Sequence, residues 1–526
     1  MSVRRLARAL PRALVPLVLF VPFTAPAQQP AAPLDVEEAS IADIQRALRS
    51  GTTCRSLVQR YLDRIAAYDK NGPAINAIVV VNADALAVAD SLDRRYRATN
   101  RFVGSLHCVP MIVKDNMQTI GLQTAAGSLA LAGNAPTKDA FQVRQIKDAG
   151  AIVLAKSNMA EFAFSPYETV SSILPGYTRN PYALDRVTAG SSGGTAAAVT
   201  SSFGAAGLGT DTGNSIRGPS SHNALVGIRS TMGLTSRAGI APLNLWADIA
   251  GPMARTVADA VAIFQVVAGY DPDDPATEAA RGRTLPDYSA SLVTDGLKGT
   301  RIGVLRQAYE RPTADPEVLA VFNNALAELR WAGASVVDTV LVPELDSLLR
   351  ANRGSCNPFK FELNQWLTAA GNNAPIKSLE DVLKSGRYHP SIQKRMEVAQ
   401  TESLPPATNP GCKPRAALRE ALGAAVVRAM DRQRLDALVY PTWSNPPRLI
   451  GDLNTPAGDN SQLFSPATGF PAINVPMGFT RGGVLPAGMT IFGRPWSEPV
   501  LIKLAYSYEQ ATHHRRPPAS TPPLRD

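Results

Sequence analysis

Apolar residues recur at helical spacing in three stretches of the chain. The segment from Thr53 to Tyr68 predicts an amphipathic helix behind Thr52 as N-cap, because its apolar positions fall on one helical face. Two further helices are expected over Phe141–Asp148, closed by Gly150, and over Thr256–Val267, closed by Gly269. The apolar face of the first helix consists of Leu57, Val58, Tyr61, Leu62 and Ile65.

Short apolar runs between these helical patterns predict buried strands. Alternation of such strands with helices is typical of an α/β fold in which helices cover both faces of a mixed, mostly parallel, twisted sheet. The predicted strands are Ile78–Val81, Val109–Val113, Ile152–Leu154, Ile302–Leu305, Leu438–Tyr440 and Ile473–Pro476.

The 526 residues are best interpreted as one large domain over residues 34–514. No internal repeat with a fixed period is evident. Patches rich in proline and glycine near 271–286 and 404–414 are read as surface insertions, since the alternation of strands and helices resumes after each. A proline-rich tail over residues 515–526 is expected to be loosely ordered.

The N-terminus resembles an export signal over residues 1–27. Arginines precede an apolar run from Leu14 to Phe23, and Ala25-Pro26-Ala27 offers a cleavage site. A membrane anchor is the alternative interpretation, although the run is short and contains two prolines. The mature protein is therefore expected in the periplasm or outside the cell, by the general or the twin-arginine route. The arginines are Arg4, Arg5, Arg8 and Arg12.

Composition and charge narrow the classes of function. Hydrophobic residues make up 45% of the chain and charged residues 18%, as in globular proteins. Loss of the four signal arginines lowers the formal net charge from +9 to +5. This modest excess, without a basic stripe, argues against a nucleic-acid partner. No stretch beyond the N-terminus is apolar enough to predict stable membrane insertion.

Cysteine and histidine residues are too few and too scattered for a metal site, and no cofactor is expected. The five histidines are dispersed, and the four cysteines form no C-x-x-C pair. An oxidising compartment would allow one or two disulfides. Cys356 and Cys412 are the candidate pair, because both lie in loop-like sequence.

Lys114 directly follows an apolar strand in "CVPMIVKDN". Buried lysines are rare unless they are paired or functional. Lys114 could be a snorkelling residue paired with Asp115. Alternatively, burial in a dry site would lower its pKa toward neutrality and make the amine a general base that activates a serine without histidine.

The loop "TAGSSGGTAAA" carries Ser191 and Ser192. Its G-x-S-x-G pattern places Ser192 where an α/β-hydrolase nucleophile would lie. That interpretation requires a downstream histidine, and only His389 and the His513-His514 pair follow at a distance. A phosphate loop is disfavoured, because the G-x-x-x-x-G-K-[ST] spacing is absent.

The stretch "GTDTGNSIRGP", residues 209–219, contains three glycines and Ser215. The glycines could serve as turn residues between a strand and a helix. Alternatively, consecutive backbone N–H groups could converge on a negative charge, with Ser215 as a nucleophile.

Several of these motifs together resemble the amidase signature family of serine hydrolases. The motifs "CVPMIVKDN", "GSSGGTAAAV", "GTDTGNSIRGP", "DIAGPMARTVADA", "ATGFPAINVPMGF" and "FGRPWSEPVLIKLAYSYEQAT" occur in the family's order over nearly all of the mature chain. The resemblance implies a catalytic triad of Lys114, Ser191 and Ser215, with a cis peptide bond before Ser191. Ser215 would attack the amide carbonyl, Ser191 would relay the proton, and neutral Lys114 would act as the base.

The same resemblance implies an oxyanion hole formed by the backbone N–H groups of Thr212, Gly213, Asn214 and Ser215. Asn214 departs from the family, which usually has glycine before the nucleophile. Asparagine tolerates positive φ better than most residues, so the loop is expected to keep its shape.

Residues around this loop have structural interpretations as well. Asp211 and Arg217 are expected to brace the loop rather than bind substrate, and His222 is expected to make a hydrogen bond at a helix start or in the core. The stretch 156–167 lies where the family's substrate wall begins.

The resulting prediction is an exported amidase that forms an acyl-serine intermediate on a small-molecule or peptide amide. A peptide C-terminal amide, an amino-acid amide or an aryl amide is the preferred substrate class. The alternatives are a non-catalytic binding protein on the same fold and an amidotransferase-type subunit. The sequence leaves a homodimer open.

Overall fold

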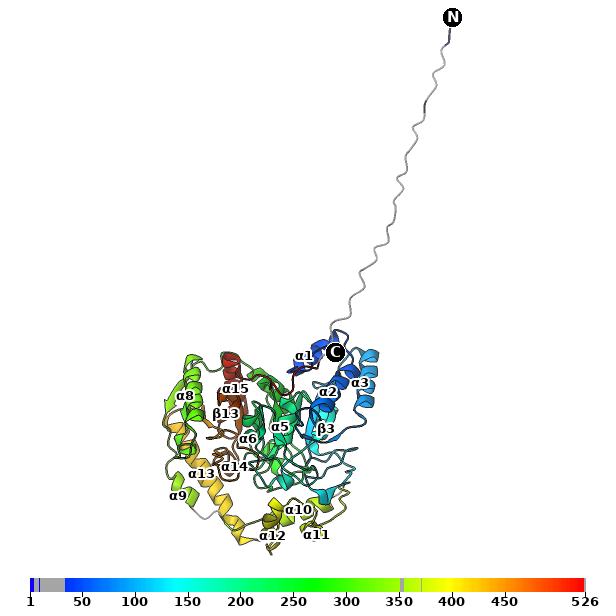
Figure 1. Cartoon of the computed structure of the whole chain (residues 1–526). Coiled ribbons are helices and arrows are strands. Elements are labelled where there is room, and N and C mark those ends of the chain that lie inside the picture. Colours follow the sequence, from blue (N-terminus) through cyan, green and yellow to red (C-terminus); the bar gives the residue numbers. More distant parts are fainter. Residues whose placement is uncertain (4–8, 10–33, 351–353, 370, 525–526) are drawn as a thin grey trace. The chain divides into compact units, whose positions relative to one another are not determined.

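The computed structural model describes residues 1–3, 9, 34–350, 354–369 and 371–524 (Figure 1). The predicted signal peptide lies almost entirely outside the described residues. Residues from Leu34 onward form one compact unit, which contains the whole predicted domain.

Within the described residues, eleven strands form one sheet and two short strands pair separately. The order across the large sheet is β1-β3-β2-β6-β8-β7-β12-β13-β11-β9-β10. Its strands are β1 (Ile78–Val81), β2 (Pro110–Lys114), β3 (Ile152–Ser157), β6 (Ala206–Asp211), β7 (Val226–Arg229), β8 (Ile249–Ala254), β9 (Arg301–Val304), β10 (Ser335–Asp338), β11 (Ala437–Pro441), β12 (Ala472–Thr480) and β13 (Leu485–Phe492). The separate pair is β4 (Arg179–Asn180) and β5 (Ala183–Val187).

The large sheet combines parallel and antiparallel pairs. β2 runs parallel to β3 and to β6, and β9 runs parallel to β10 and β11. The middle of the sheet, from β6 through β8, β7, β12 and β13 to β11, is antiparallel. The predicted mixed α/β sheet is confirmed. The parallel strands β2 and β6 end side by side, so that Lys114 and the loop after Asp211 meet at the same end of the two strands.

Helices cover both faces of the sheet. α5 packs on the face toward which Gly207 and Gly209 of β6 point, whereas Leu208 joins the main core with α7. The helices are α1 (Ile41–Arg49), α2 (Cys54–Tyr68), α3 (Ala85–Thr99), α4 (Phe141–Asp148), α5 (Gly193–Thr200), α6 (Arg217–His222), α7 (Val257–Val267), α8 (Pro316–Trp331), α9 (Leu345–Arg350), α10 (Phe359–Thr368), α11 (Leu379–Ser385), α12 (Gln393–Gln400), α13 (Lys413–Arg432), α14 (Ser465–Thr468) and α15 (Glu498–Thr512).

The N-terminal cap of α2 differs from the predicted one. Thr53, rather than Thr52, is the N-cap, and its side chain accepts a hydrogen bond from the backbone N–H of Ser56. The helix therefore begins one residue later, at Cys54. The predicted strands and the other two helices lie within four residues of the observed ends, and the bounds of β1 and α4 coincide with the predicted ones.

β6 contains two glycines because its neighbours approach closely. A Cβ atom at Gly207 would lie 2.5 Å from Thr195 Cγ2, and one at Gly209 would lie 2.8 Å from Met253 Sδ. Gly209 is thus a strand residue, and the interpretation of it as a turn residue was wrong. The missing side chains let α5 lie close to the sheet and bring the Ser191 loop toward the end of β6.

Two disulfides are present. Cys356–Cys412 confirms the candidate pair, and Cys54–Cys108 is a second bridge. The first closes a segment of the chain that contains α10, α11 and α12, which Figure 1 shows gathered at one end of the body next to α13. These three helices share an apolar cluster with Phe162 and Phe164, so the segment packs against the stretch 156–167.

The described part of the tail, residues 515–524, contacts the body. Arg515 pairs with Glu38, and Arg64 donates hydrogen bonds to the carbonyl oxygens of Thr521 and Pro522. These contacts contradict the expected loosely ordered tail. Proline-rich backbone lacks N–H donors, but its carbonyl oxygens remain free to accept hydrogen bonds from arginine.

No helix in the described part of the chain is both long and apolar enough to cross a bilayer. The same residues contain no group of three or more histidine, cysteine, aspartate or glutamate side chains placed to hold a metal ion.

Candidate active site

Lys114 is the last residue of β2 and is completely buried. Its Nζ donates hydrogen bonds to Ser191 Oγ and to Thr210 Oγ1, each at 2.8 Å. Asn116 Nδ2 donates to the same Thr210 oxygen at 3.1 Å. Lys114 therefore points into the protein, toward a serine that lies 77 residues further along the chain, and the snorkelling interpretation is excluded.

Burial lowers the pKa of Lys114 to about 7, although the nearby carboxylates of Asp211 and Asp248 raise it in part. Removing an ammonium group from water disfavours its charged form. A large fraction of the lysine is therefore neutral near pH 7, and a neutral amine can accept a proton from a hydroxyl group.

Asp115, the proposed partner of a snorkelling Lys114, is paired elsewhere. Its carboxylate lies 3.8 Å from Lys156 Nζ, and both side chains are fully buried. Asp115 also accepts hydrogen bonds from the backbone N–H groups of Ala125 and Gly127. Lys156 and Asp115 thus form a separate buried pair that anchors the segment after β2.

The two serines of the loop before α5 have different surroundings. Ser191 follows a cis peptide bond from Gly190, as the family resemblance implied, and its hydroxyl group faces Lys114. Ser192 Oγ donates to the carbonyl oxygen of Thr210 at 3.2 Å and accepts from the Thr210 N–H at 3.3 Å. Ser192 is bound to the backbone of β6 and is absent from the pocket lining, which removes the support for a nucleophile elbow.

Ser215 lies on the loop between β6 and α6, where its backbone carbonyl accepts a hydrogen bond from Ser192 N–H at 3.3 Å. This bond joins the two serine loops. Among the described residues, none accepts a hydrogen bond from the backbone N–H groups of Thr212, Gly213, Asn214 or Ser215. The loop therefore presents consecutive uncommitted donors beside a pocket, which is the arrangement that binds an anionic oxygen.

Asp211 and Arg217 hold this loop, as the sequence predicted. The Asp211 carboxylate pairs with Arg217 at 3.1 Å and with Arg229 at 3.0 Å, and it accepts the N–H of Ile216. Although burial opposes it, the two guanidinium groups hold the pKa of Asp211 below its usual value. Arg217 also donates to the Gly213 carbonyl at 2.7 Å, so that this carbonyl is turned toward the arginine.

Asp248 connects the same loop to the opposite wall. It accepts a hydrogen bond from Thr212 Oγ1 at 2.5 Å, and its second oxygen accepts from the N–H groups of Leu243 and Asn244 at 3.0 Å each. Leu243 and Asn244 line the pocket. Asp248 therefore fixes the position of two walls relative to each other.

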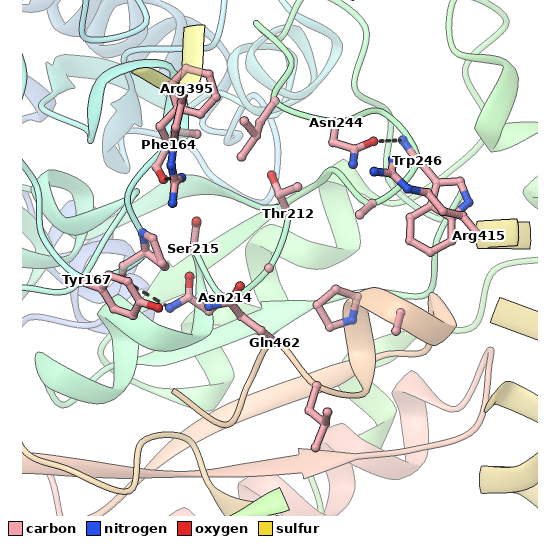
Figure 2. Close-up of a pocket in the computed structure, with 18 of the residues that line it drawn as sticks. Phe164, Tyr167, Thr212, Asn214, Ser215, Asn244, Trp246, Arg395, Arg415 and Gln462 are labelled. Atoms are coloured by element: carbon pink, nitrogen blue, oxygen red, sulfur yellow. Dashed lines mark hydrogen bonds between the residues drawn. The ribbon is translucent and has the colours of Figure 1, made fainter. Parts of the chain in front are cut away.

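A cavity of about 570 Å³ opens over Ser215 and the loop 212–214. Figure 2 shows Ser215 and Thr212 between Phe164 and Tyr167 on one side and Trp246 on the other, with Gln462 below. A volume of this size holds a dipeptide-sized ligand. The lining residues are Ala163, Phe164, Pro166, Tyr167, Thr212, Gly213, Asn214, Ser215, Leu243, Asn244, Trp246, Ala247, Gly354, Arg395, Arg415, Leu418, Gln462, Leu463, Pro466 and Ala467.

Asn214 lines the pocket, and its side chain is anchored to the neighbouring wall. Its Nδ2 donates to the Pro166 carbonyl at 3.4 Å. A Cβ atom at Gly218 would lie 2.6 Å from that nitrogen, so glycine at 218 makes room for asparagine at 214. Asn214 has no positive φ, and the expected loop shape therefore needs no left-handed conformation at this position.

His222 lies beside the site without contributing to it. The imidazole is buried and stacks on the Trp443 ring, with ring centroids 4.6 Å apart. Burial lowers the pKa of His222 to about 3, so the ring is neutral. Stacking holds this residue, rather than the core hydrogen bond that the sequence suggested.

Several pocket residues were missed by the sequence reasoning. Phe164 and Tyr167 fall within the predicted wall, which was not resolved to individual residues. Trp246, Arg395 and Arg415 come from three distant segments and are brought together only by the fold. The cation of Arg419 lies 3.6 Å from the centre of the Trp246 ring, which fixes that wall.

A comparison with protein families finds that residues 56–502 match the Amidase family model. A probable amidase of Arabidopsis thaliana is 34% identical over 505 residues, which cover 92% of each chain. A glutamyl-tRNA(Gln) amidotransferase subunit of Symbiobacterium thermophilum is 33% identical, over 88% of this chain and 95% of its own. Among solved structures, the native peptide amidase of Stenotrophomonas maltophilia superposes with a TM-score of 0.84 at 37% identity, over 92% of this chain and 99% of its own.

Proposed function

Since the chain belongs to the amidase family and is an amide-hydrolysing enzyme, we propose that it acts through Ser215 as nucleophile, Ser191 as proton relay and Lys114 as general base. The observation that carries this assignment is the 2.8 Å hydrogen bond between Lys114 and Ser191, on a loop whose next residue, Ser192, donates its N–H to the carbonyl oxygen of the pocket residue Ser215. A lysine with a pKa near 7 in a dry site supplies the base that histidine supplies in other serine hydrolases.

In the first half-reaction, Ser215 Oγ attacks the amide carbonyl carbon. The Ser215 proton passes to Ser191 Oγ while the Ser191 proton passes to the neutral Nζ of Lys114. The carbonyl oxygen becomes an oxyanion that accepts hydrogen bonds from the backbone N–H groups of residues 212–215. Each well-placed donor of this kind contributes about 3 kcal/mol to the stability of the transition state.

In the second half-reaction, the C–N bond breaks and the amine leaves with the proton that Lys114 returns through Ser191. The acyl group remains as an ester on Ser215. Water then attacks this ester, gives its proton to the neutral Lys114, and releases the acid, after which the proton returns to Ser215. The net reaction consumes one water and yields an acid and an amine, or an acid and ammonia when the substrate is a C-terminal peptide amide.

The preferred substrate is the C-terminal amide of a short peptide, with amino-acid and aryl amides as the neighbouring class. The solved structure of a peptide amidase with 37% identity supports this choice. The cavity volume and its aromatic walls Phe164, Tyr167 and Trp246 suit a substrate of two or three residues.

Export belongs to the same proposal. Two disulfides within the described residues fit an oxidising compartment, because disulfides rarely persist in the cytosol. Cleavage after Ala27 predicts a mature chain that begins at Gln28. The mass of the N-terminal peptide from protein recovered outside the cytoplasm tests this: an N-terminus at Met1 would contradict it.

The catalytic assignment is tested by treating the purified protein with a fluorophosphonate and mapping the adduct by mass spectrometry. We expect one adduct, on Ser215, in the wild type and in Ser192→Ala, and none in Ser215→Ala. Lys114→Ala should form the adduct much more slowly. An adduct on Ser192 would restore the nucleophile-elbow interpretation, and amide hydrolysis that required a partner protein or tRNA would favour the amidotransferase alternative.

A further inference from the structure

Among the described residues, the lining of the pocket carries two cationic side chains and no carboxylate. Arg395 of α12 and Arg415 of α13 both line it, and none of the other lining residues is aspartate or glutamate. Figure 2 shows the two guanidinium groups entering the pocket from different sides, Arg395 near Phe164 and Arg415 near Trp246. The walls between them are apolar or neutral.

Neither arginine is neutralised by an ion pair. In the described part of the chain, no carboxylate lies within 4.0 Å of Arg395 or Arg415. Each is instead anchored by a backbone carbonyl: Arg395 donates to Phe164 O, and Arg415 donates to Cys356 O. A guanidinium group has five N–H donors, so each side chain is held in place while most of its donors remain available.

The carboxyl groups near the pocket accept hydrogen bonds from groups other than the two arginines. Asp248 binds Thr212 and the 243–244 backbone, and Asp459 accepts from Gln462 Nε2. The Glu362 carboxylate accepts the Leu245 N–H, and burial raises the pKa of Glu362 to about 7. Burial lowers the pKa of Arg415, and the charge of Glu362 partly opposes that change. No carboxylate therefore lies among the described lining residues, and the two guanidinium groups are the charged side chains that a ligand in the cavity would meet there.

We propose that the enzyme selects amides whose acyl part carries a carboxylate, in particular peptide amides with an acidic side chain in one of the two residues nearest the scissile bond. This deepens the proposed function and rests on it. Arginine matches a carboxylate with paired, charge-assisted hydrogen bonds. The apolar walls Phe164, Trp246 and Leu463 accept the rest of the acyl chain.

The test measures kcat/KM for matched pairs of N-acetyl dipeptide amides that carry Glu or Met at either residue, with Phe at the other. We expect the wild type to prefer Glu over Met at one position at least. Arg395→Gln or Arg415→Gln should lower kcat/KM for the Glu substrate by about 10- to 100-fold, and change the Met substrate by less than about 3-fold.

Matched controls come from the same helices. Lys394→Gln and Lys413→Gln remove an equal charge from exposed neighbours that do not line the pocket, and they should leave the Glu preference unchanged. The inference is overturned if the wild type hydrolyses Met substrates as well as Glu substrates at both positions. It is also overturned if the arginine variants affect both substrates equally, or if the lysine controls abolish the preference.

A binding measurement distinguishes a failure of this inference from a failure of the proposed function. If the wild type hydrolyses none of these amides, the proposed peptide-amide activity is wrong, and calorimetry with Ser215→Ala decides the inference. Tighter binding of a Glu peptide than of its Met partner, lost in Arg395→Gln or Arg415→Gln, would support the cationic subsite. Equal binding of the two would overturn it.

Discussion

The side chains of Lys114 and Ser191 share a hydrogen bond of 2.8 Å in a place that water does not reach, since both residues are fully buried. In the proposed mechanism the lysine acts on the substrate through this serine, and its lowered pKa sets the pH at which it can accept a proton.

This coupling predicts the pH dependence of the reaction. Burial brings the pKa of Lys114 to about 7, and the neutral amine is the active form. Below this pKa the lysine is protonated and cannot accept a proton, so kcat/KM for an amide should rise with pH through about 7 and then level off. A rate profile that stays flat from pH 5 to 9, with chemistry rate-limiting, would contradict the assignment.

Substitution of the lysine should remove most of the activity. We expect Lys114→Ala to lose about 10²- to 10⁴-fold in kcat, the range typical of general acid–base catalysis. The loss should be smaller for an activated ester than for an amide, because a better leaving group needs no proton. Measuring kcat for both substrates with the same acyl group checks this.

The neighbouring serines should respond differently to alanine substitution. Ser191→Ala breaks the proton relay and should lower kcat by about 10²-fold or more. Ser192→Ala removes only hydrogen bonds to the Thr210 backbone, so it should cost about 1 kcal/mol of unfolding free energy and less than about tenfold in kcat. Equal losses of kcat in the two variants would show that the assignment of roles is wrong.

Substitution of Arg217 should lower the free energy of unfolding. Arg217→Met leaves Asp211 with one of its two guanidinium partners and frees the Gly213 carbonyl, and we expect a loss of about 3–5 kcal/mol in unfolding free energy. Denaturant unfolding measures this. Arg281→Met, which breaks an exposed pair with Glu278, is the control and should leave the free energy of unfolding almost unchanged. Similar costs in both variants would contradict the bracing role.

Asn214 and Gly218 should be energetically coupled. Gly218→Ala places a methyl group about 2.6 Å from Asn214 Nδ2 and should destabilise the protein by about 1–3 kcal/mol. The Asn214→Gly substitution removes that obstacle, so the double variant should recover part of the loss. A double-mutant cycle measures the coupling, and strictly additive effects would argue against it.

Motifs whose residues lie within one short segment of the chain could be predicted from the sequence. The Lys114 strand end and the two serine loops each carry a local pattern. The structure brings Lys114 and Ser191 into hydrogen-bond contact, and the catalytic roles of these residues stay a prediction. Strands with alternating or continuous apolar residues, such as β1 and β11, were also found. β6 was missed because its glycines have low strand propensity, and only the packing of α5 explains them.

The substrate walls could not be predicted in this way. Arg395 and Arg415 lie on amphipathic helices, where a single arginine is indistinguishable from a solvent-exposed residue. Their relation to Ser215 depends on the fold of a segment more than 150 residues away in sequence. The Cys54–Cys108 bridge likewise has no local signature, because it depends on α2 lying against the chain just before β2.

The pairing of Arg515 with Glu38, at 2.6 Å, brings the beginning and the end of the domain to one place. A domain in which residues 38 and 515 lie in contact is a suitable starting point for circular permutation, since a short linker could join these two points and new ends could be opened in an exposed turn. Fusion partners attached next to residues 38 and 515 would leave the body from neighbouring points. A chain truncated before residue 515 and extended by a tag would lose the ion pair between Arg515 and Glu38.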